Sequence, residues 1–210
     1  MSYSTNYTDE NGTREVSITE RDSIEALRND YNDAVRKYNP RYVVIRRVQT
    51  KPGEALHLKV EVKAPTHYLT SGEDTTPKSC SSMVVDVVAY PGYPLRGVRA
   101  SYALDHYLAS PNVFRSGAAC IDDWIPFTSS LVSVIDKLVH DMIHDPNVTR
   151  YESMANPSME QWHKNGVAAK RFPTIHPKLL YAPETAALPP RNRAAAKSVA
   201  TPPPLPGRRR

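Results

Sequence analysis

The 210-residue sequence has little cysteine and no long apolar run, and these absences exclude several classes of protein. Its two cysteines, Cys80 and Cys120, are too few for a disulfide framework or a cysteine-rich metal site. No apolar run approaches the ~20 residues that a helix needs to span a bilayer, and the polar start MSYSTNYTDENGT has no signal-peptide core. We therefore expect a cytoplasmic protein without a membrane partner, in reducing surroundings that preserve a free thiol.

The formal charge of +5 is distributed unevenly along the chain. From Gly166 onward there are nine Lys and Arg residues against one acid, Glu184, which leaves 18 basic and 21 acidic residues in 1–165. Nine of the 19 prolines also lie in 166–210, which therefore lacks the apolar surface that would offset the entropy of ordering. We expect a flexible lead-in over 1–18, one domain over 19–165, and a largely disordered, Pro-rich basic tail over 166–210.

Three interpretations of the basic tail remain open. It is a flexible solvated end, an electrostatic contact for an acidic partner or nucleic acid, or a Pro-rich ligand for another protein. The domain itself is mildly acidic, so any contact with nucleic acid is expected to involve the tail.

The first half of the domain has the pattern of a helix followed by a β-meander. Thr19 is expected to cap a helix that ends near Tyr38 before Pro40. Its apolar residues recur at spacings of three and four and should share one face: Ile24, Leu27, Tyr31, Val35 and Tyr38. Three runs rich in β-branched or alternating apolar residues then predict strands at 41–49, 56–64 and 83–90, with a loop over 66–82.

The second half combines an irregular stretch with helices. Residues 91–126 are rich in Gly, Pro, Ser and Asn, and a second helix is expected from Thr128 to about 144. A short third helix should run over 157–164, with Asn156 as its N-cap and Gly166 as its exit. A helix, antiparallel strands and further helices together predict an α+β domain.

A long irregular segment inside a compact domain is often functional, and this one carries an ordered series of motifs. The series runs YPGYP at 90–94, SPNV at 110–113, GAACID at 117–122 and WIPFT at 124–128, and DPN follows at 145–147. It resembles the core of E2 ubiquitin-conjugating enzymes, which have a YPxxP turn, His-Pro-Asn, a Gly three residues before the catalytic Cys, and a Trp–Pro pair. Eight positions separate Asn112 from Cys120, as in that family.

The resemblance implies a UBC-like fold with an N-terminal helix, an antiparallel β-meander, a catalytic loop and C-terminal helices. It implies that Cys120 accepts a ubiquitin-like modifier from an E1-type activating enzyme as a thioester and passes it to a target amine or a ligase, with no cofactor and no metal. The helix over 20–38 would dock the E1, and the loops at 91–94 and 124–127 would meet ligases.

Two residues of this series are candidates for catalysis, and five more are expected to shape the loop. Cys120 is the nucleophile, and an Asn112 amide near the thioester could donate a hydrogen bond to the oxyanion formed during aminolysis. In the family this Asn is also argued to hold the loop, and both roles stay open. The loop-shaping residues are Ser110, Pro111, Gly117, Asp122 and Trp124. Cys80 is expected to be incidental.

The sequence also departs from the E2 pattern. Ser110 stands where the family has a His thought to stabilise the loop, which puts the rigidity of the loop in question. The stretch from Tyr90 to Asn112 is longer than usual, with 101–107 as the insertion. Many E2 enzymes also have an acidic residue after the Asp-Pro-Asn motif that orients the incoming lysine of the target. That residue is unassigned here, although Glu152 lies nearby. Such departures indicate a divergent member, of the kind found in bacterial ubiquitin-like conjugation operons, for which we also expect a role in antiphage defence.

Two rival functions stay open. A non-catalytic UBC or RWD-like binding module typically lacks the cysteine at this position. A cysteine hydrolase would need a His base that the sequence does not locate. His140 and His144 lie one helical turn apart, but the metalloprotease Glu is missing, so we expect them on a solvated helix face.

Overall fold

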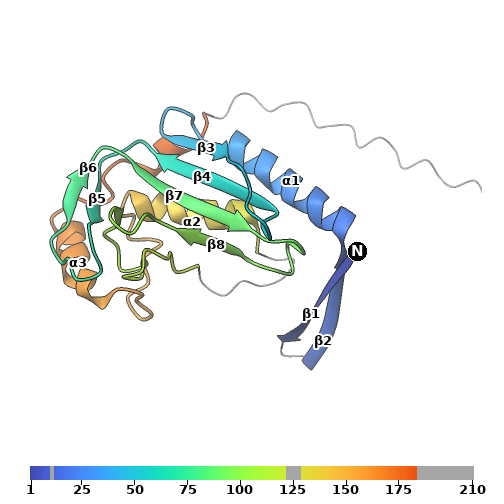
Figure 1. Ribbon diagram of the computed structural model, residues 1–210. Helices are drawn as coiled ribbons and strands as arrows, with labels where there is room; N and C mark the ends of the chain where they lie inside the picture. Colours follow the sequence, from blue (N-terminus) through green and yellow to red (C-terminus); the bar gives the residue numbers. More distant parts are fainter. Residues whose placement is uncertain (10–11, 122–128, 184–210) are drawn as a thin grey trace, which may run out of the picture.

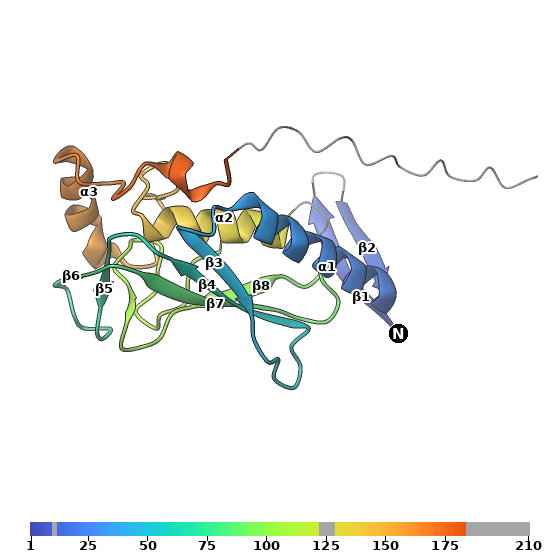
Figure 2. The same ribbon diagram turned by 90° about the horizontal axis from the view of Figure 1, so that it is seen from above.

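The computed structural model describes residues 1–9, 12–121 and 129–183 and has an α+β architecture. A four-stranded antiparallel sheet has the order β3-β4-β7-β8, and a second, three-stranded sheet has the order β6-β5-β9. Figure 2 shows α1 and α2 along one face of the larger sheet. The strands are β1 (Ser2–Asp9), β2 (Gly12–Thr19), β3 (Val43–Arg47), β4 (Leu56–Val62), β5 (Thr66–Leu69), β6 (Lys78–Cys80), β7 (Met83–Ala89), β8 (Val98–Ser101) and β9 (Tyr107–Leu108). The helices are α1 (Glu20–Lys37), α2 (Leu131–Met142) and α3 (Glu160–Ala168), with short 3-10 turns at Pro157–Met159 and Pro177–Leu180.

The meander predicted from the apolar patterns is present. In β4 and β7 every second residue is buried, so that one face of the sheet is apolar. This face packs against α2, whose own apolar stripe is almost fully buried: Leu131, Val134, Ile135, Leu138, Val139 and Met142. The predicted α+β class and the antiparallel meander are therefore confirmed.

Helix α1 begins and ends where expected, but it buries a different face. The side chain of Thr19 accepts a hydrogen bond from the backbone N–H of Asp22, as an N-cap does. The buried positions are Ser23, Leu27 and Ala34, whereas Ile24 and Val35 are 51% and 45% exposed. The predicted stripe was therefore wrong for these two residues, because α1 packs against β3 and α2 through a narrower face.

The expected lead-in over 1–18 is instead an antiparallel hairpin of β1 and β2. Its register runs from Ser2 opposite Thr19 to Asp9 opposite Gly12. Figure 1 shows the hairpin projecting from the N-terminal end of α1. Tyr3, Val16 and Ile18 are half-buried and alternate with exposed neighbours such as Ser17, which is the alternation that a strand requires.

Strands also occur where the sequence predicted loops. Residues 66–82 contain β5 and β6, and the stretch over 91–126 contains β8 and β9. Strand β8 extends the larger sheet as its fourth member. It pairs with β7 in a register that runs from Ala89 opposite Val98 to Asp86 opposite Ser101. These strands have two to four residues each, which is too short for a clear period in the sequence.

The third helix continues further than expected. The turn at Pro157–Met159 runs directly into α3, Asn156 makes no side-chain cap bond, and Gly166 lies inside the helix. A Cβ at Gly166 would lie 2.1 Å from Cε2 of Phe172, so this glycine makes room for a ring from the following segment.

Residues 166–183 therefore belong to the folded domain and not to a disordered tail. Phe172 and Leu180 are buried, and the N–H of Ala182 donates to the carbonyl of Lys37 at the end of α1. Residues 184–210 of the predicted tail lie outside the described residues. Across the described parts of the chain, no helix combines the length and the apolar character needed to cross a membrane.

Candidate functional site

The thiol of Cys120 lies on an irregular segment between the sheet and α2, as expected. Cys120 directly follows Ala119, which forms an isolated β-bridge with Val113. The N–H of Cys120 donates to the carbonyl oxygen of Asn112 at 2.8 Å. Cys120 forms no disulfide with the other cysteine and is only partly buried. The segment is thus ordered by backbone hydrogen bonds without being part of a regular element.

The segment before the thiol is attached to the outer edge of β8. The N–H of Ala119 donates to the carbonyl of Ala100, and the N–H of Tyr102 donates to the carbonyl of Gly117. Gly117 has φ +79°, and a Cβ there would lie 2.9 Å from the carbonyl oxygen of Tyr102. Only glycine adopts this conformation at such close approach without strain. The loop-shaping role predicted for Gly117 therefore has a structural basis in its contact with Tyr102.

A buried carboxylate on α2, that of Asp141, forms hydrogen bonds with the loop that precedes the thiol segment. Oδ1 of Asp141 accepts hydrogen bonds from Oγ of Ser110 at 2.8 Å and from Nδ2 of Asn112 at 3.0 Å. The N–H of Asn112 in turn donates to Oγ of Ser110 at 3.1 Å. All three side chains are at most 3% exposed, and such fully buried bonds are costly to break. Asp141 was not singled out from the sequence, although an acid inside the apolar stripe of a helix signals a buried partner.

This network bears on the two roles left open for Asn112. An amide nitrogen carries two hydrogens, and Nδ2 of Asn112 donates one to Asp141 and one to the carbonyl of Val148 at 3.3 Å. In this arrangement the amide braces the loop, and donation to an oxyanion would require one of these bonds to break. Ser110 takes part in the same network, so the absence of a histidine here does not leave the loop unsupported.

Pro111 adds a link to the C-terminal part of the domain. It is buried, and its carbonyl accepts a hydrogen bond from the N–H of Asn156 at 2.9 Å. Two further predicted loop-shaping residues, Asp122 and Trp124, lie outside the described residues.

A second residue of α2 that the sequence did not single out reaches the thiol-bearing residue itself. Nζ of Lys137 donates to the backbone carbonyl of Cys120 at 2.9 Å. Lys137 and Asp141 are one helical turn apart and face the same loop. Both backbone polar groups of Cys120 are therefore bonded, the N–H to Asn112 and the C=O to Lys137.

A groove of about 440 Å³ opens beside the thiol. It is lined by strand β8 on one side and by the thiol segment on the other, and its walls are mostly apolar with one cation, Arg99. Phe114 at its rim is 45% exposed. The lining of the groove among the described residues is Val98, Arg99, Ala100, Ser101, Phe114, Ala118, Ala119, Cys120 and Ile121, which includes no histidine.

The two histidines expected on a solvated helix face are instead held inside the domain, so that prediction was wrong. Nδ1 of His140 lies 2.7 Å from Oδ2 of Asp145, and its Nε2 lies 2.6 Å from Oη of Tyr181. His144 is fully buried, and burial lowers its pKa well below the usual value. The physical reason is that the segment over 171–183, expected to be disordered, folds over this end of α2.

Cys80 lies at the end of β6, paired with Thr66 across the small sheet. Burial raises the pKa of the Cys80 thiol, which makes the thiolate less available. Cys80 does not line the groove beside Cys120.

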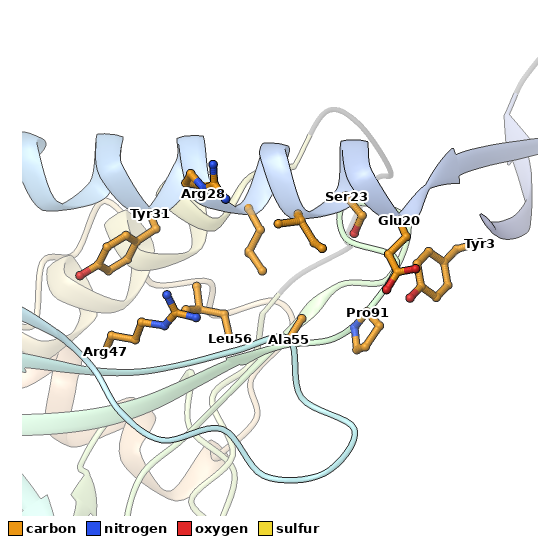
Figure 3. Close-up of a pocket in the computed structure, with 11 residues that line it drawn as sticks. Tyr3, Glu20, Ser23, Arg28, Tyr31, Arg47, Ala55, Leu56 and Pro91 are labelled. Atoms are coloured by element: carbon orange, nitrogen blue, oxygen red, sulfur yellow. The ribbon is translucent and has the colours of Figure 1, made fainter. Parts of the chain in front are cut away.

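A second cavity, of about 330 Å³, lies between α1, the hairpin and the start of β4 (Figure 3). Tyr3 of the hairpin and Pro91 of the YPGYP turn close one end, and Tyr31 and Arg47 lie toward the other. Gly92 allows the turn to approach the hairpin, since a Cβ there would lie 2.9 Å from Cγ of Tyr3. This cavity is at the predicted E1-docking helix and is separate from the groove at the thiol.

The YPGYP turn also joins the two long helices. Oη of Tyr93 donates to a carboxylate oxygen of Asp30 on α1 and accepts a hydrogen bond from the N–H of Leu131, the first residue of α2, at 2.7 Å. Tyr93 is 1% exposed, so these bonds are shielded from water.

A comparison with models of known protein families gives no match, and a search of curated proteins finds no significant relative.

Proposed function

We propose that the protein is an E2-type conjugating enzyme with a UBC-like fold, which carries a ubiquitin-like modifier as a thioester on Cys120. The observation that carries the proposal is the partly exposed thiol on a rigid, irregular loop. The eight-residue interval to Asn112 corresponds to a backbone hydrogen bond that closes this loop. A carrier that two proteins must reach in turn needs a thiol of this kind.

The chemistry consists of two acyl transfers. The Cys120 thiolate attacks the thioester carbonyl between modifier and E1, a new C–S bond forms, and the thiolate of the E1 leaves. An amine of the target then attacks the new thioester, the C–N bond forms, and the Cys120 thiolate leaves after the amine loses a proton. Neither step calls for a metal or a bound cofactor. The groove beside Cys120 suits the extended C-terminus of such a modifier.

The cavity beside α1 supports the docking role proposed for this helix. Ile24 is 51% exposed next to the cavity, and Leu27 and Leu56 line its floor. An aromatic or aliphatic anchor from an E1 could enter it, with Glu20 and Arg28 at hand for charged partners.

The hydrolase alternative finds less support. The described lining of the groove contains no histidine, and the rings of His140 and His144 lie against Asp145 and His67. A non-catalytic binding module would need no thiol at this position, where Cys120 borders the groove.

Charging assays distinguish these functions. Incubation with a candidate E1, modifier and ATP should give an adduct that reductant removes. Cys120→Ser should give a more stable oxyester, Cys120→Ala should give no adduct, and the control Cys80→Ala should charge as the wild type does. An adduct that requires Cys80 in place of Cys120 would contradict the proposal.

A further inference from the structure

The chemistry proposed for Cys120 places negative charge on sulfur and on a carbonyl oxygen, and the side chain expected to help is already engaged. The amide of Asn112 donates both hydrogens elsewhere, to Asp141 and to the carbonyl of Val148. A different group that contacts the thiol-bearing residue is therefore of interest. The ammonium of Lys137 is such a group, because it donates to the backbone carbonyl of Cys120.

We propose that Lys137 is a positioning residue for Cys120, whose ammonium orients the thiol segment and favours the thiolate. This inference rests on the proposed thioester chemistry. The contact is a charge-assisted hydrogen bond of 2.9 Å to the carbonyl of the very residue that bears the thiol. The positive charge is therefore held on the residue that bears the sulfur, in a part-buried contact where screening by water is reduced.

The helix that carries Lys137 is well suited to hold a charge in place. Helix α2 starts with a capping box formed by Ser130 and Ser133, and most of its length is buried against the sheet. One turn further on, Asp141 fixes the preceding part of the same loop. The loop is thus held to α2 at two points. Asp141 accepts hydrogen bonds from Ser110 and Asn112, and Lys137 donates one to the carbonyl of Cys120. A site built on a rigid helix keeps its geometry during the reaction.

The ammonium is expected to act in both transfers. The nucleophile is the thiolate, so a nearby cation raises the fraction of Cys120 that can attack. During attack the negative charge moves from the sulfur to the carbonyl oxygen, and it returns to a sulfur when the leaving thiolate departs. A fixed positive charge stabilises each of these states without reorganisation.

The test measures the reactivity of the thiol itself, without any E1. In a Cys80→Ala background, the rate of Cys120 alkylation by iodoacetamide is followed from pH 5 to 10. Lys137→Gln keeps an N–H donor for the carbonyl but removes the charge, and Lys137→Arg keeps both. The matched control is Lys164→Gln, on the exposed surface of α3.

The midpoint of the pH profile should rise by about one pH unit in Lys137→Gln, the low end of the effect of a neighbouring charge. Lys137→Arg and Lys164→Gln should keep the wild-type midpoint. In the wild type, raising the salt concentration from 0.05 to 1 M should also raise the midpoint, a measurement that needs no variant. Charging of Lys137→Gln near neutral pH should be slower by up to about tenfold, following the thiolate fraction.

The outcomes separate this inference from the proposed function. Equal midpoints in wild type and Lys137→Gln, with only a lower melting temperature in the variant, would show that Lys137 is a mechanical tether and overturn the inference. A shifted midpoint in a protein that no E1 can charge would support the role of Lys137 and reject the E2 function. Charging by an E1, together with equal midpoints in wild type and Lys137→Gln, would support the E2 function and reject the role of Lys137.

Discussion

A cluster of neutral histidines should make the fold sensitive to acid. His163 of α3 is fully buried, its Nδ1 lies 2.8 Å from Oη of Tyr151, and its Nε2 has no partner in the described structure. Burial lowers the pKa of His163 from 6.5 to about 4. His144 is buried at the end of α2, and its pKa is also lowered, first by burial and then by the neighbouring His67 and His163. Protonation of this cluster would place charge among aromatic rings with few acceptors.

The sign of the effect follows from proton binding in the two states. Above pH 6.5 the histidines are neutral in both, and pH has no effect through them. Below pH 6.5 the unfolded chain takes up a proton at His163, whereas the folded protein does so only near pH 4, so the free energy of unfolding decreases. Between pH 7.5 and 5 the loss from His163 alone is about 2 kcal/mol. His144 acts in the same direction. The carboxyl of Asp136, whose pKa is lowered by Lys37 and two tyrosines despite burial, loses its contribution only at lower pH.

Urea unfolding at pH 7.5 and pH 5, followed by tryptophan fluorescence, measures this loss. A change of about 2 kcal/mol should move the midpoint by about 1 M. His163→Asn keeps an acceptor for Tyr151 but cannot titrate, so it should be less stable at pH 7.5 and yet lose about 2 kcal/mol less on acidification. The control His176→Asn alters an exposed residue and should retain the wild-type pH dependence. Equal pH dependence in wild type and His163→Asn would refute the reasoning.

Three further substitutions test the loop and the C-terminal segment. Asn112→Ala should lower the melting temperature and slow charging and discharge together in single-turnover assays, because the amide braces the loop; a loss confined to discharge to free lysine would instead indicate an oxyanion donor. Gly117→Ala should destabilise by about 2 kcal/mol or more in urea, and by more than the control Gly53→Ala, which has φ +85° but no atom within 4 Å of the added Cβ. Gly166→Ala should displace the ring of Phe172 and speed limited proteolysis of 170–183, and an unchanged cleavage rate would contradict the packing described for this segment.

The main elements of the fold could be predicted because their signals are local. Thr19 and the apolar alternation of β4 and β7 are patterns within a few residues of sequence, and each has its expected structure. The hairpin at the N-terminus was missed because its residues are mostly polar, and its contacts with the YPGYP turn and α1 join parts of the chain that a local pattern does not connect. The C-terminal segment was missed for a similar reason, since Phe172 is buried only because Gly166 leaves space in another element.

For the candidate site too, the features with a local sequence signal could be predicted, and those that depend on packing could not. The interval between Asn112 and Cys120 was visible in the sequence, and a single backbone hydrogen bond across the loop gives it a physical meaning. Asp141 and Lys137 could not be found from a local pattern, because they come from a helix that packs under the loop only after the chain has folded. The orientation of the Asn112 amide depends on that packing too, so the sequence alone left its role open.

Asp141 receives two donors from the loop, and this has a consequence for how such sites can evolve. The acceptor lies on α2, so the donor at position 110 can change as long as the carboxylate remains in reach. Among relatives of this chain, positions 110, 112 and 141 should covary. A relative that loses the acid at 141 would need a different hydrogen-bond partner for the amide at 112, and a relative with an apolar residue at 110 would leave the carboxylate one donor short. Coevolution of these three positions in an alignment of relatives would record how the loop has been kept rigid while the residues that brace it diverged.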